Sequence, residues 1–208
     1  MVNIMNINRC IKINFSFVVF LLVSLFSGLI LKSTLFILCL IFHELGHLFF
    51  IKIFKQKIRR LEITGFGLII SANFEIQPLR KGLIYSGGLI FSLFLETIFL
   101  VFNLELLKNI NLLIIIINLI PIPPLDGFNI LKTFFELFFD EEYSLDLSLD
   151  ISIIAIVLTI ILFFLTKQIF LICIVTFSLS KLIKYKSLKK IIYLKNFLKL
   201  NPHKQIAV

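Results

Sequence analysis

The sequence predicts an all-α polytopic membrane protein with about six transmembrane helices and one small membrane-associated β-hairpin. Of its 208 residues, 59% are hydrophobic and 16% are charged, whereas soluble domains contain about 45–50% apolar and about 25% charged residues. The mean hydropathy is +1.06. Apolar stretches of about 20 residues, the length that crosses a bilayer, recur along the chain. These observations argue against a water-soluble globule.

Six apolar segments have the length and composition of bilayer crossings. They cover roughly residues 15–31, 34–54, 82–104, 110–139, 151–166 and 168–183. Very short turns around Lys32 and Lys167 join the first pair and the last pair, which predicts two helical hairpins. The first segment follows Arg9 and Lys12 but precedes no small-x-small cleavage site, so we expect a permanent helix and not a removed signal.

The basic residues predict the orientation in the membrane. Six crossings place both termini on one side, and of the 21 basic residues only Lys32, Lys108 and Lys167 fall on the other side. By the positive-inside rule both termini are cytoplasmic, which predicts a multi-pass protein of the bacterial cell membrane. Topology then explains the net charge of +9. A basic tail beside anionic lipid is the expected arrangement, and no nucleic-acid partner is expected.

Between the second and third spans, residues 55–81 are too polar to cross. The pieces 60–64 and 68–74 have β-branched, alternating character and flank a Gly-containing turn, which predicts a hairpin. We expect it to lie against the helix bundle, because strand edges at membrane depth need cover from protein or a water-filled cavity; an ordinary cytoplasmic hairpin is the alternative. The predicted catalytic-type domain covers residues 1–184, with a core at about 15–139 and accessory helices at 151–183. Residues 185–208 form a basic cytoplasmic tail.

Ionisable residues inside the predicted spans are few, and three of them lie together in the second span. The stretch IFHELGHLFF places His43, Glu44 and His47 in the middle of an apolar helix. Ionisable groups are costly in a bilayer and therefore indicate function. The histidines are one helical turn apart, so both imidazoles can bind one ion with Glu44 beside them. A pair of structural histidines is the alternative, but it leaves Glu44 without a cation. The pattern favours one Zn²⁺ per chain.

Catalytic zinc takes three protein ligands and keeps one position open, so a third ligand must come from elsewhere. Phe50 and Ile53 occupy the positions that a metzincin motif would need, and Glu62 and Glu75 are poorly placed for a thermolysin-type ligand. Glu96 lies in the third span without a companion motif, where it can also snorkel or pair with a polar neighbour. It is a minor candidate.

The fourth span offers a better candidate in the stretch NLIPIPPLDGFNIL. Its three prolines interrupt the helix, because proline lacks an N–H and clashes with the preceding turn. Asp126 and Gly127 follow at mid-membrane depth, where a broken helix lets the carboxylate reach a metal held by the facing helix. Asn118 offers both a donor and an acceptor to the same cavity. A kink with a satisfied structural Asp is the alternative.

HELGH in one span and NLIPIPPLDG in a later one resemble the paired signature of the site-2 proteases, intramembrane zinc metalloproteases that cut substrate helices within or near the bilayer. The resemblance covers about residues 15–137. It implies that His43, His47 and Asp126 are the zinc ligands and that Glu44 is the catalytic carboxylate. It also implies that Asn118 assists in positioning the substrate or the transition state.

The compact six-span layout is most similar to the stage IV sporulation protein FB group. Family members often have Gly-Pro followed by Asn in the third span, whereas this chain has Gly87-Gly88 and Phe91. Many members of the sporulation group carry a C-terminal CBS domain, for which this chain lacks room. The resemblance implies a membrane protein or membrane-associated peptide as substrate, such as a sigma-factor precursor or an anti-sigma factor, and regulatory membrane proteins as further partners.

The implied reaction assigns a proton transfer to Glu44. Zinc lowers the pKa of a bound water toward about 7, and Glu44 accepts the proton and passes it to the leaving amine. Helical peptide bonds are shielded, so we expect the substrate to unwind by adding as a strand to the hairpin edge. A membrane zinc transporter and a catalytically silent scaffold are the alternatives. The chain shows no repeated halves of the kind that transporters have. A silent scaffold would be expected to lose the catalytic carboxylate or a metal ligand, and this chain keeps all four of these residues.

Overall fold

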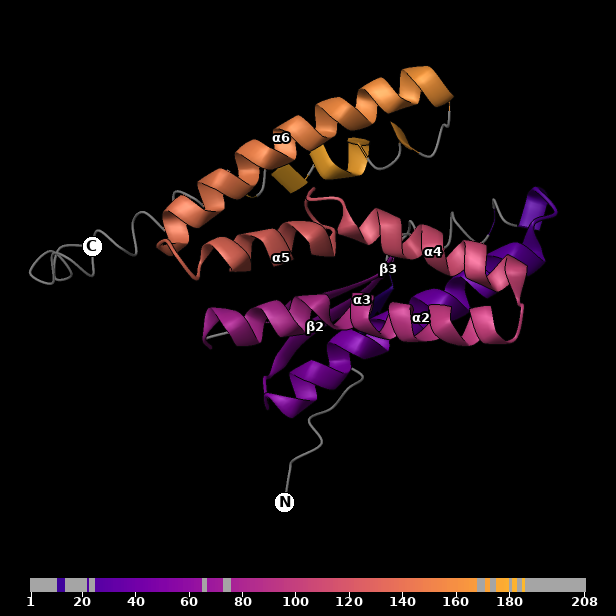
Figure 1. Ribbon diagram of the computed structural model, residues 1–208, viewed down its shortest axis with the longest axis horizontal. Helices are drawn as coiled ribbons and strands as arrows, with labels where there is room; N and C mark the ends of the chain where they lie inside the picture. Colours follow the sequence, from indigo (N-terminus) through magenta and orange to yellow (C-terminus); the bar gives the residue numbers. More distant parts are fainter. Residues whose placement is uncertain are drawn as a thin grey trace, which may run out of the picture. The chain divides into compact units, whose positions relative to one another are not determined.

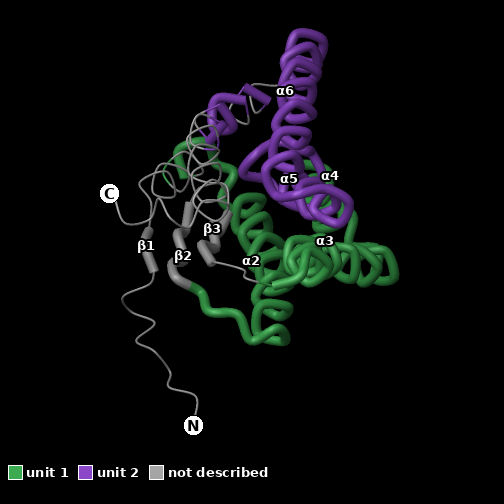
Figure 2. The backbone as a smooth tube through the Cα atoms, turned by 90° about the vertical axis from the view of Figure 1, so that its left-hand side faces the viewer, with its two compact units in different colours: residues 1–117 green, residues 118–208 purple. Residues whose placement is uncertain are grey.

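The computed structural model describes residues 11–13, 22, 25–64, 67–72, 76–167, 171–172, 175–179, 181–182 and 185. The chain divides into two compact units, residues 1–117 and 118–208 (Figure 2). In the part that the structure describes, helices predominate. Three of these helices are long and apolar enough to cross a membrane, namely α2 (Ile30–Ile53), α3 (Pro78–Val101) and α6 (Glu141–Thr166) (Figure 1). The chain is thus a multi-pass membrane protein.

Helices α2 and α3 coincide with the second and third predicted spans, whereas α6 begins ten residues before the predicted start at 151. The Asp140 side chain explains this earlier start, because it accepts a hydrogen bond from the backbone N–H of Tyr143 and caps the helix. Glu141 and Glu142 follow in the first turn, where negative charge is favourable. Counting apolar residues missed this polar beginning of the helix.

The turn predicted around Lys32 is wrong in position. Lys32 lies within the first turn of α2, and the chain turns earlier, at Gly28, whose φ is 69°. Glycine adopts this left-handed conformation without steric cost, and lysine does so less readily. At the position of the other predicted turn, Lys167 follows the end of α6 with φ 54°, and its N–H donates to the carbonyl of Phe163. Residues 168–170, which would complete the turn, lie outside the described residues. Parts of the first and last predicted spans lie outside the described residues.

A three-stranded sheet lies between α2 and α3 in the chain. Strand β2 (Ile58–Thr64) pairs antiparallel with β3 (Gly67–Ala72), in the region where the hairpin is predicted. Strand β1 (Ile11–Ile13), which was not predicted, pairs parallel with β2, so the strand order is β1-β2-β3. Strand β3 contacts α2. Residues 65–66 and 73–75 of the predicted hairpin lie outside the described residues.

Two glycines bring α2 and α3 together in the first unit. A Cβ atom on Gly46 would overlap the backbone carbonyl of Gly87, and a Cβ on Gly87 would overlap the backbone of Gly46. Neither helix can therefore carry a side chain at this crossing. Further along, Cys39, Phe99 and Ile114 form a buried apolar cluster that joins α2 and α3 to α4 (Glu105–Leu119).

The fourth predicted span is two helices in the structure. Helix α4 ends at Leu119, and α5 (Asp126–Phe135) begins after a stretch that contains Pro121, Pro123 and Pro124. The predicted helix break is confirmed, and its physical cause is the lost N–H donors and the steric clash of the proline rings. A single crossing over residues 110–139 is replaced by a short helix on each side of the break.

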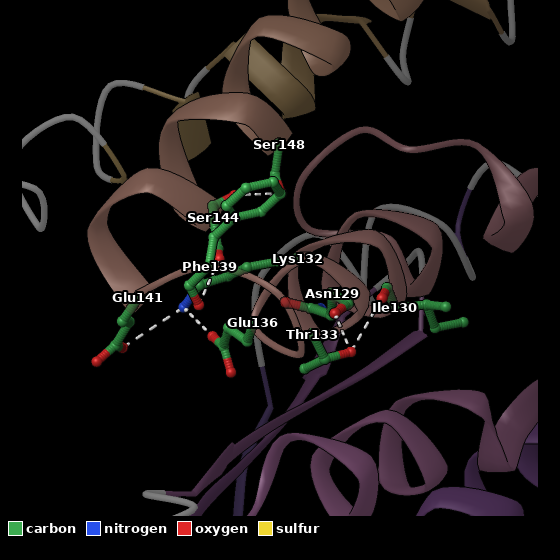
Figure 3. Close-up of polar contacts among 9 residues, drawn as sticks. All are labelled: Asn129, Ile130, Lys132, Thr133, Glu136, Phe139, Glu141, Ser144 and Ser148. Carbon is green, nitrogen blue, oxygen red and sulfur yellow. Dashed lines mark hydrogen bonds and ion pairs between the residues drawn. The ribbon is translucent and has the colours of Figure 1, made fainter.

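In the second unit, α5 and α6 pack around a cluster of buried residues that includes Ile122, Phe128 and Leu145. Lys132 of α5 lies 3.2 Å from Glu136 and 3.6 Å from Glu141 at the beginning of α6 (Figure 3). This ion-pair group is partly exposed, so it contributes little to stability. The buried apolar contacts carry most of the helix packing.

Candidate metal centre

Helix α2 presents His43 and His47 on one buried face. The two residues are 1% and 7% exposed, and their ring centroids lie 5.1 Å apart. This is the arrangement that the spacing predicts, because residues four apart in an α-helix lie above one another. Two imidazoles this close together can both contribute ligand atoms to one metal ion.

The backbone of α3 determines the tautomer of His47. Nδ1 of His47 lies 2.8 Å from the backbone carbonyl oxygen of Ile84. A carbonyl oxygen only accepts hydrogen bonds, so the proton lies on Nδ1 and the neutral ring keeps its lone pair on Nε2. Histidines that bind metals are held in this way, with the other ring nitrogen donating to a carbonyl, a carboxylate or water.

The imidazole of His43 is held by a side chain of α3. Nδ1 of His43 lies 2.9 Å from the hydroxyl oxygen of Ser92, and both residues are buried. Ser92 was not singled out from the sequence. Serine is common in apolar helices, where its hydroxyl usually bonds its own backbone, so the residue type carried no signal.

Gly88 lies directly against both histidines. A Cβ atom on Gly88 would overlap Nε2 of His43 and Nε2 of His47. Nε2 of both rings therefore lies against the same point of α3, and this close approach is possible because Gly88 has no side chain. Any larger residue there would displace at least one imidazole.

Asp126 is the first residue of α5, directly after the helix break. Its neighbour Gly127 packs so tightly on the end of α4 that a Cβ atom would overlap the carbonyl of Leu119. The Ser152 hydroxyl, from α6, lies 2.7 Å from the carbonyl oxygen of Pro121 and donates to it, which satisfies a backbone acceptor freed by the break. Contacts within the second unit thus stabilise the helix break, and the break places Asp126 at the beginning of α5.

His43, His47 and Asp126 form a group that can hold a metal ion. Each residue offers one ligand atom, and these atoms all lie within 4.8 Å of one another. Two imidazole nitrogens and one carboxylate oxygen are a donor set that suits zinc, and they leave a fourth position open. The hydrogen-bonded Nδ1 atoms and the two Nε2 atoms that converge at Gly88 are what such a metal would require, so the residues fit the ion.

The two residues expected to do chemistry have different surroundings. Glu44 follows His43 on α2 and is buried, at 9% exposure. Asn118 lies in the last turn of α4, immediately before the break, and is half-buried. Burial of an ionisable carboxylate next to a metal-binding histidine is costly without a function or a partner.

Glu96, the minor candidate for the third ligand, is used elsewhere. Its carboxylate accepts a hydrogen bond of 2.6 Å from the side-chain amide of Asn111 in α4. It therefore pairs with a polar neighbour, which was the other role expected of it, and it is not part of the metal-binding group.

The solved structures contain a similar fold. No family model and no curated protein matches the chain. The structure of the Site-2 Protease from Methanocaldococcus jannaschii is similar, with a TM-score of 0.64 and 21% sequence identity over 82% of this chain and 89% of that chain. The fold is that of a site-2 protease. At this identity the likeness establishes the fold alone, and the chemistry has to be argued from the residues.

On this site-2 protease fold, the metal-binding group occupies residues that two separate sequence motifs contribute. His43 and His47 come from HELGH in α2, and Asp126 comes from the LDG that begins α5. These three residues are the ones that the two motifs offered as metal ligands. Ile84, Gly88 and Ser92 of α3 are additions that the sequence reasoning missed.

Proposed function

We propose that the chain is an intramembrane zinc metalloprotease that hydrolyses a peptide bond of a transmembrane or membrane-associated substrate. The observation that carries this proposal is the group of His43, His47 and Asp126, next to the buried Glu44, in a chain with the site-2 protease fold. His43, His47 and Asp126 are the proposed ligands of one Zn²⁺. Ionisable groups within otherwise apolar membrane helices are costly, so their presence indicates such a function.

Glu44 is the proposed general base and general acid. When bound, zinc supplies Lewis-acid activation of a water and of the substrate carbonyl. Glu44 accepts a proton from the attacking water and transfers it to the amine that leaves. Its position next to His43 in the buried part of α2 favours this role.

Asn118 is the proposed positioning group for the substrate. It precedes the helix break, and its side-chain amide has both a donor and an acceptor. The amide N–H groups can donate to an oxygen on which negative charge develops during peptide hydrolysis. The carbonyl oxygen remains available to an N–H group of the substrate backbone.

The edge of β3 is the proposed docking site for an unwound substrate segment. In the strand order β1-β2-β3, one edge of β3 pairs with no other described strand. A peptide added at this edge makes main-chain hydrogen bonds and becomes extended. This would expose the scissile bond, which is shielded while the substrate is helical.

The orientation in the membrane, the substrate type and the partners belong to the same proposal. The distribution of basic residues favours cytoplasmic termini in a bacterial cell membrane. Within the family that the motifs resemble, a sigma-factor precursor, as in the sporulation group, or an anti-sigma factor is the proposed substrate type. Regulatory membrane proteins are proposed partners, and the bilayer is the solvent for the spans.

The test compares the wild-type chain with Glu44→Gln, and uses Glu105→Gln as the matched control. Glu105 is an exposed residue at the beginning of α4 that pairs with Lys108. Each variant is co-expressed with a panel of epitope-tagged single-span membrane proteins, and substrate fragments are quantified on immunoblots. We expect Glu44→Gln to lower cleavage by about 10²- to 10⁴-fold, because it removes the proton acceptor. Glu105→Gln should cleave like the wild type.

Zinc flux into proteoliposomes distinguishes the two alternatives from proteolysis. Equal fragment yields from the wild type and Glu44→Gln would refute the protease. Zinc uptake that survives the substitution would favour a transporter. Bound zinc without either activity would favour a silent scaffold.

A further inference from the structure

We propose that Ser92 is a positioning residue of the metal site, whose hydroxyl holds the His43 imidazole with Nε2 toward the metal. This inference rests on the proposed zinc function. The hydroxyl oxygen lies 2.9 Å from Nδ1 of His43, and the two residues are 0% and 1% exposed. Water therefore has no access to Nδ1, and Ser92 supplies the partner that solvent would otherwise supply.

The direction of this hydrogen bond follows from metal binding. A neutral imidazole that binds a metal through Nε2 carries its proton on Nδ1. Nδ1 of His43 then donates to the Ser92 oxygen, and the hydroxyl proton stays free to bond elsewhere. Removing this oxygen would take away the hydrogen bond that holds the ring in this orientation in the metal-bound state.

Ser92 completes a regular pattern on α3. Ile84, Gly88 and Ser92 are spaced four residues apart, so they lie on one face over three successive turns. The first contributes a carbonyl to His47, the second lets both Nε2 atoms approach the helix backbone, and the third contributes a hydroxyl to His43. One helix face thus holds both imidazoles without providing a ligand.

Helix α4 fixes the turn of α3 that carries Ser92. The Asn111 amide nitrogen donates to the backbone carbonyl of Ser92 at 2.9 Å and to the carboxylate of Glu96 at 2.6 Å. Asn111 is fully buried. These two bonds span one turn of α3, so the backbone at Ser92 is held while its hydroxyl contacts His43. A held backbone is what a positioning side chain requires.

Zinc affinity of the detergent-solubilised full chain tests this role. The dissociation constant is measured by competition with a chromogenic chelator for the wild type, Ser92→Ala, Ser92→Thr and Ser148→Ala. Ser148 is the matched control, because it is equally buried and its hydroxyl bonds only backbone among the contacts shown (Figure 3). The melting temperature of each metal-free variant is measured in parallel, since a merely structural role would appear there.

We expect Ser92→Ala to weaken zinc binding by about 10- to 100-fold, the range typical of hydrogen-bond partners of metal ligands. Ser92→Thr keeps the hydroxyl and should restore the affinity, and Ser148→Ala should bind like the wild type. Wild-type affinity in Ser92→Ala would overturn the inference alone. An equal loss in Ser92→Ala and Ser92→Thr would also overturn it, because packing and not the hydroxyl would be the cause. A wild-type chain that binds no zinc would refute the proposed function together with this inference.

Discussion

His47 donates its Nδ1–H to the backbone carbonyl oxygen of Ile84 over 2.8 Å, so the main chain of α3 determines the metal-binding nitrogen of a side chain on α2. This bond requires the two helices to approach closely. The close approach is possible because Gly46 and Gly87 meet where any Cβ atom would overlap the opposite backbone. The glycine contact that packs α2 against α3 therefore also allows the hydrogen bond that orients His47.

Gly88→Ala should remove metal binding more than it removes stability. The added methyl group would overlap Nε2 of both His43 and His47, so at least one ring must move away from the metal position. We expect zinc affinity to fall on the order of 100-fold, since the effect exceeds the loss of one outer hydrogen bond. Chelator competition measures the affinity. Full affinity in Gly88→Ala would show that the ion does not bind through the two Nε2 atoms that lie against this glycine.

Asp126→Asn and Glu96→Gln should separate the two candidates for the third ligand. Asp126 belongs to the metal-binding group, whereas Glu96 pairs with Asn111. Asp126→Asn should weaken zinc binding by more than the roughly 10- to 100-fold loss typical of an outer partner. Glu96→Gln should stay within about threefold, because glutamine still accepts the hydrogen bond of Asn111. The reverse order of losses would assign the ligand to Glu96.

Proline substitutions in β3 test substrate docking at its edge. Neighbouring residues of a strand direct their N–H groups to opposite edges, so Ile69→Pro and Ile70→Pro remove donors from different sides. The variant that alters the open edge should keep its zinc and cleave about tenfold less, because a lost hydrogen bond and the ring clash cost about 1.4 kcal/mol or more. Immunoblots of fragments and metal analysis are the measurements. Wild-type cleavage in both variants would rule out strand addition.

Asp140→Ala should destabilise the beginning of α6 without affecting zinc. The Asp140 carboxylate accepts from the N–H of Tyr143, and the loss of such a cap costs about 1 kcal/mol. Asp150→Ala, at an exposed position inside the same helix, should change the unfolding free energy by no more than about 0.5 kcal/mol. Denaturant titration of the solubilised chain compares the two. Equal stabilities would mean that the cap does not hold this helix end.

The amphipathic and apolar patterns accounted for much of the helical framework. Apolar length predicted α2 and α3, and the prolines predicted the break before Asp126, since both depend on local chemistry that a single segment carries. The same local patterns also gave a wrong beginning for α6 and a wrong position for the first turn. The helix that begins at Glu141 and the turn at Gly28 depend on a capping side chain and on a left-handed backbone, which hydropathy does not report.

The sequence by itself determined which residue types are available for a metal site. His43 and His47 share one helix face because of their spacing, and Asp126 follows a break that proline chemistry requires. Only the tertiary structure decided which α3 groups surround them. Ser92 and the Ile84 carbonyl acquire their roles when α3 packs against α2, and Gly88 lies against the imidazoles for the same reason. In the sequence alone, a serine, a backbone carbonyl and a glycine do not indicate a metal site, because their effect depends on the partner that packing places beside them.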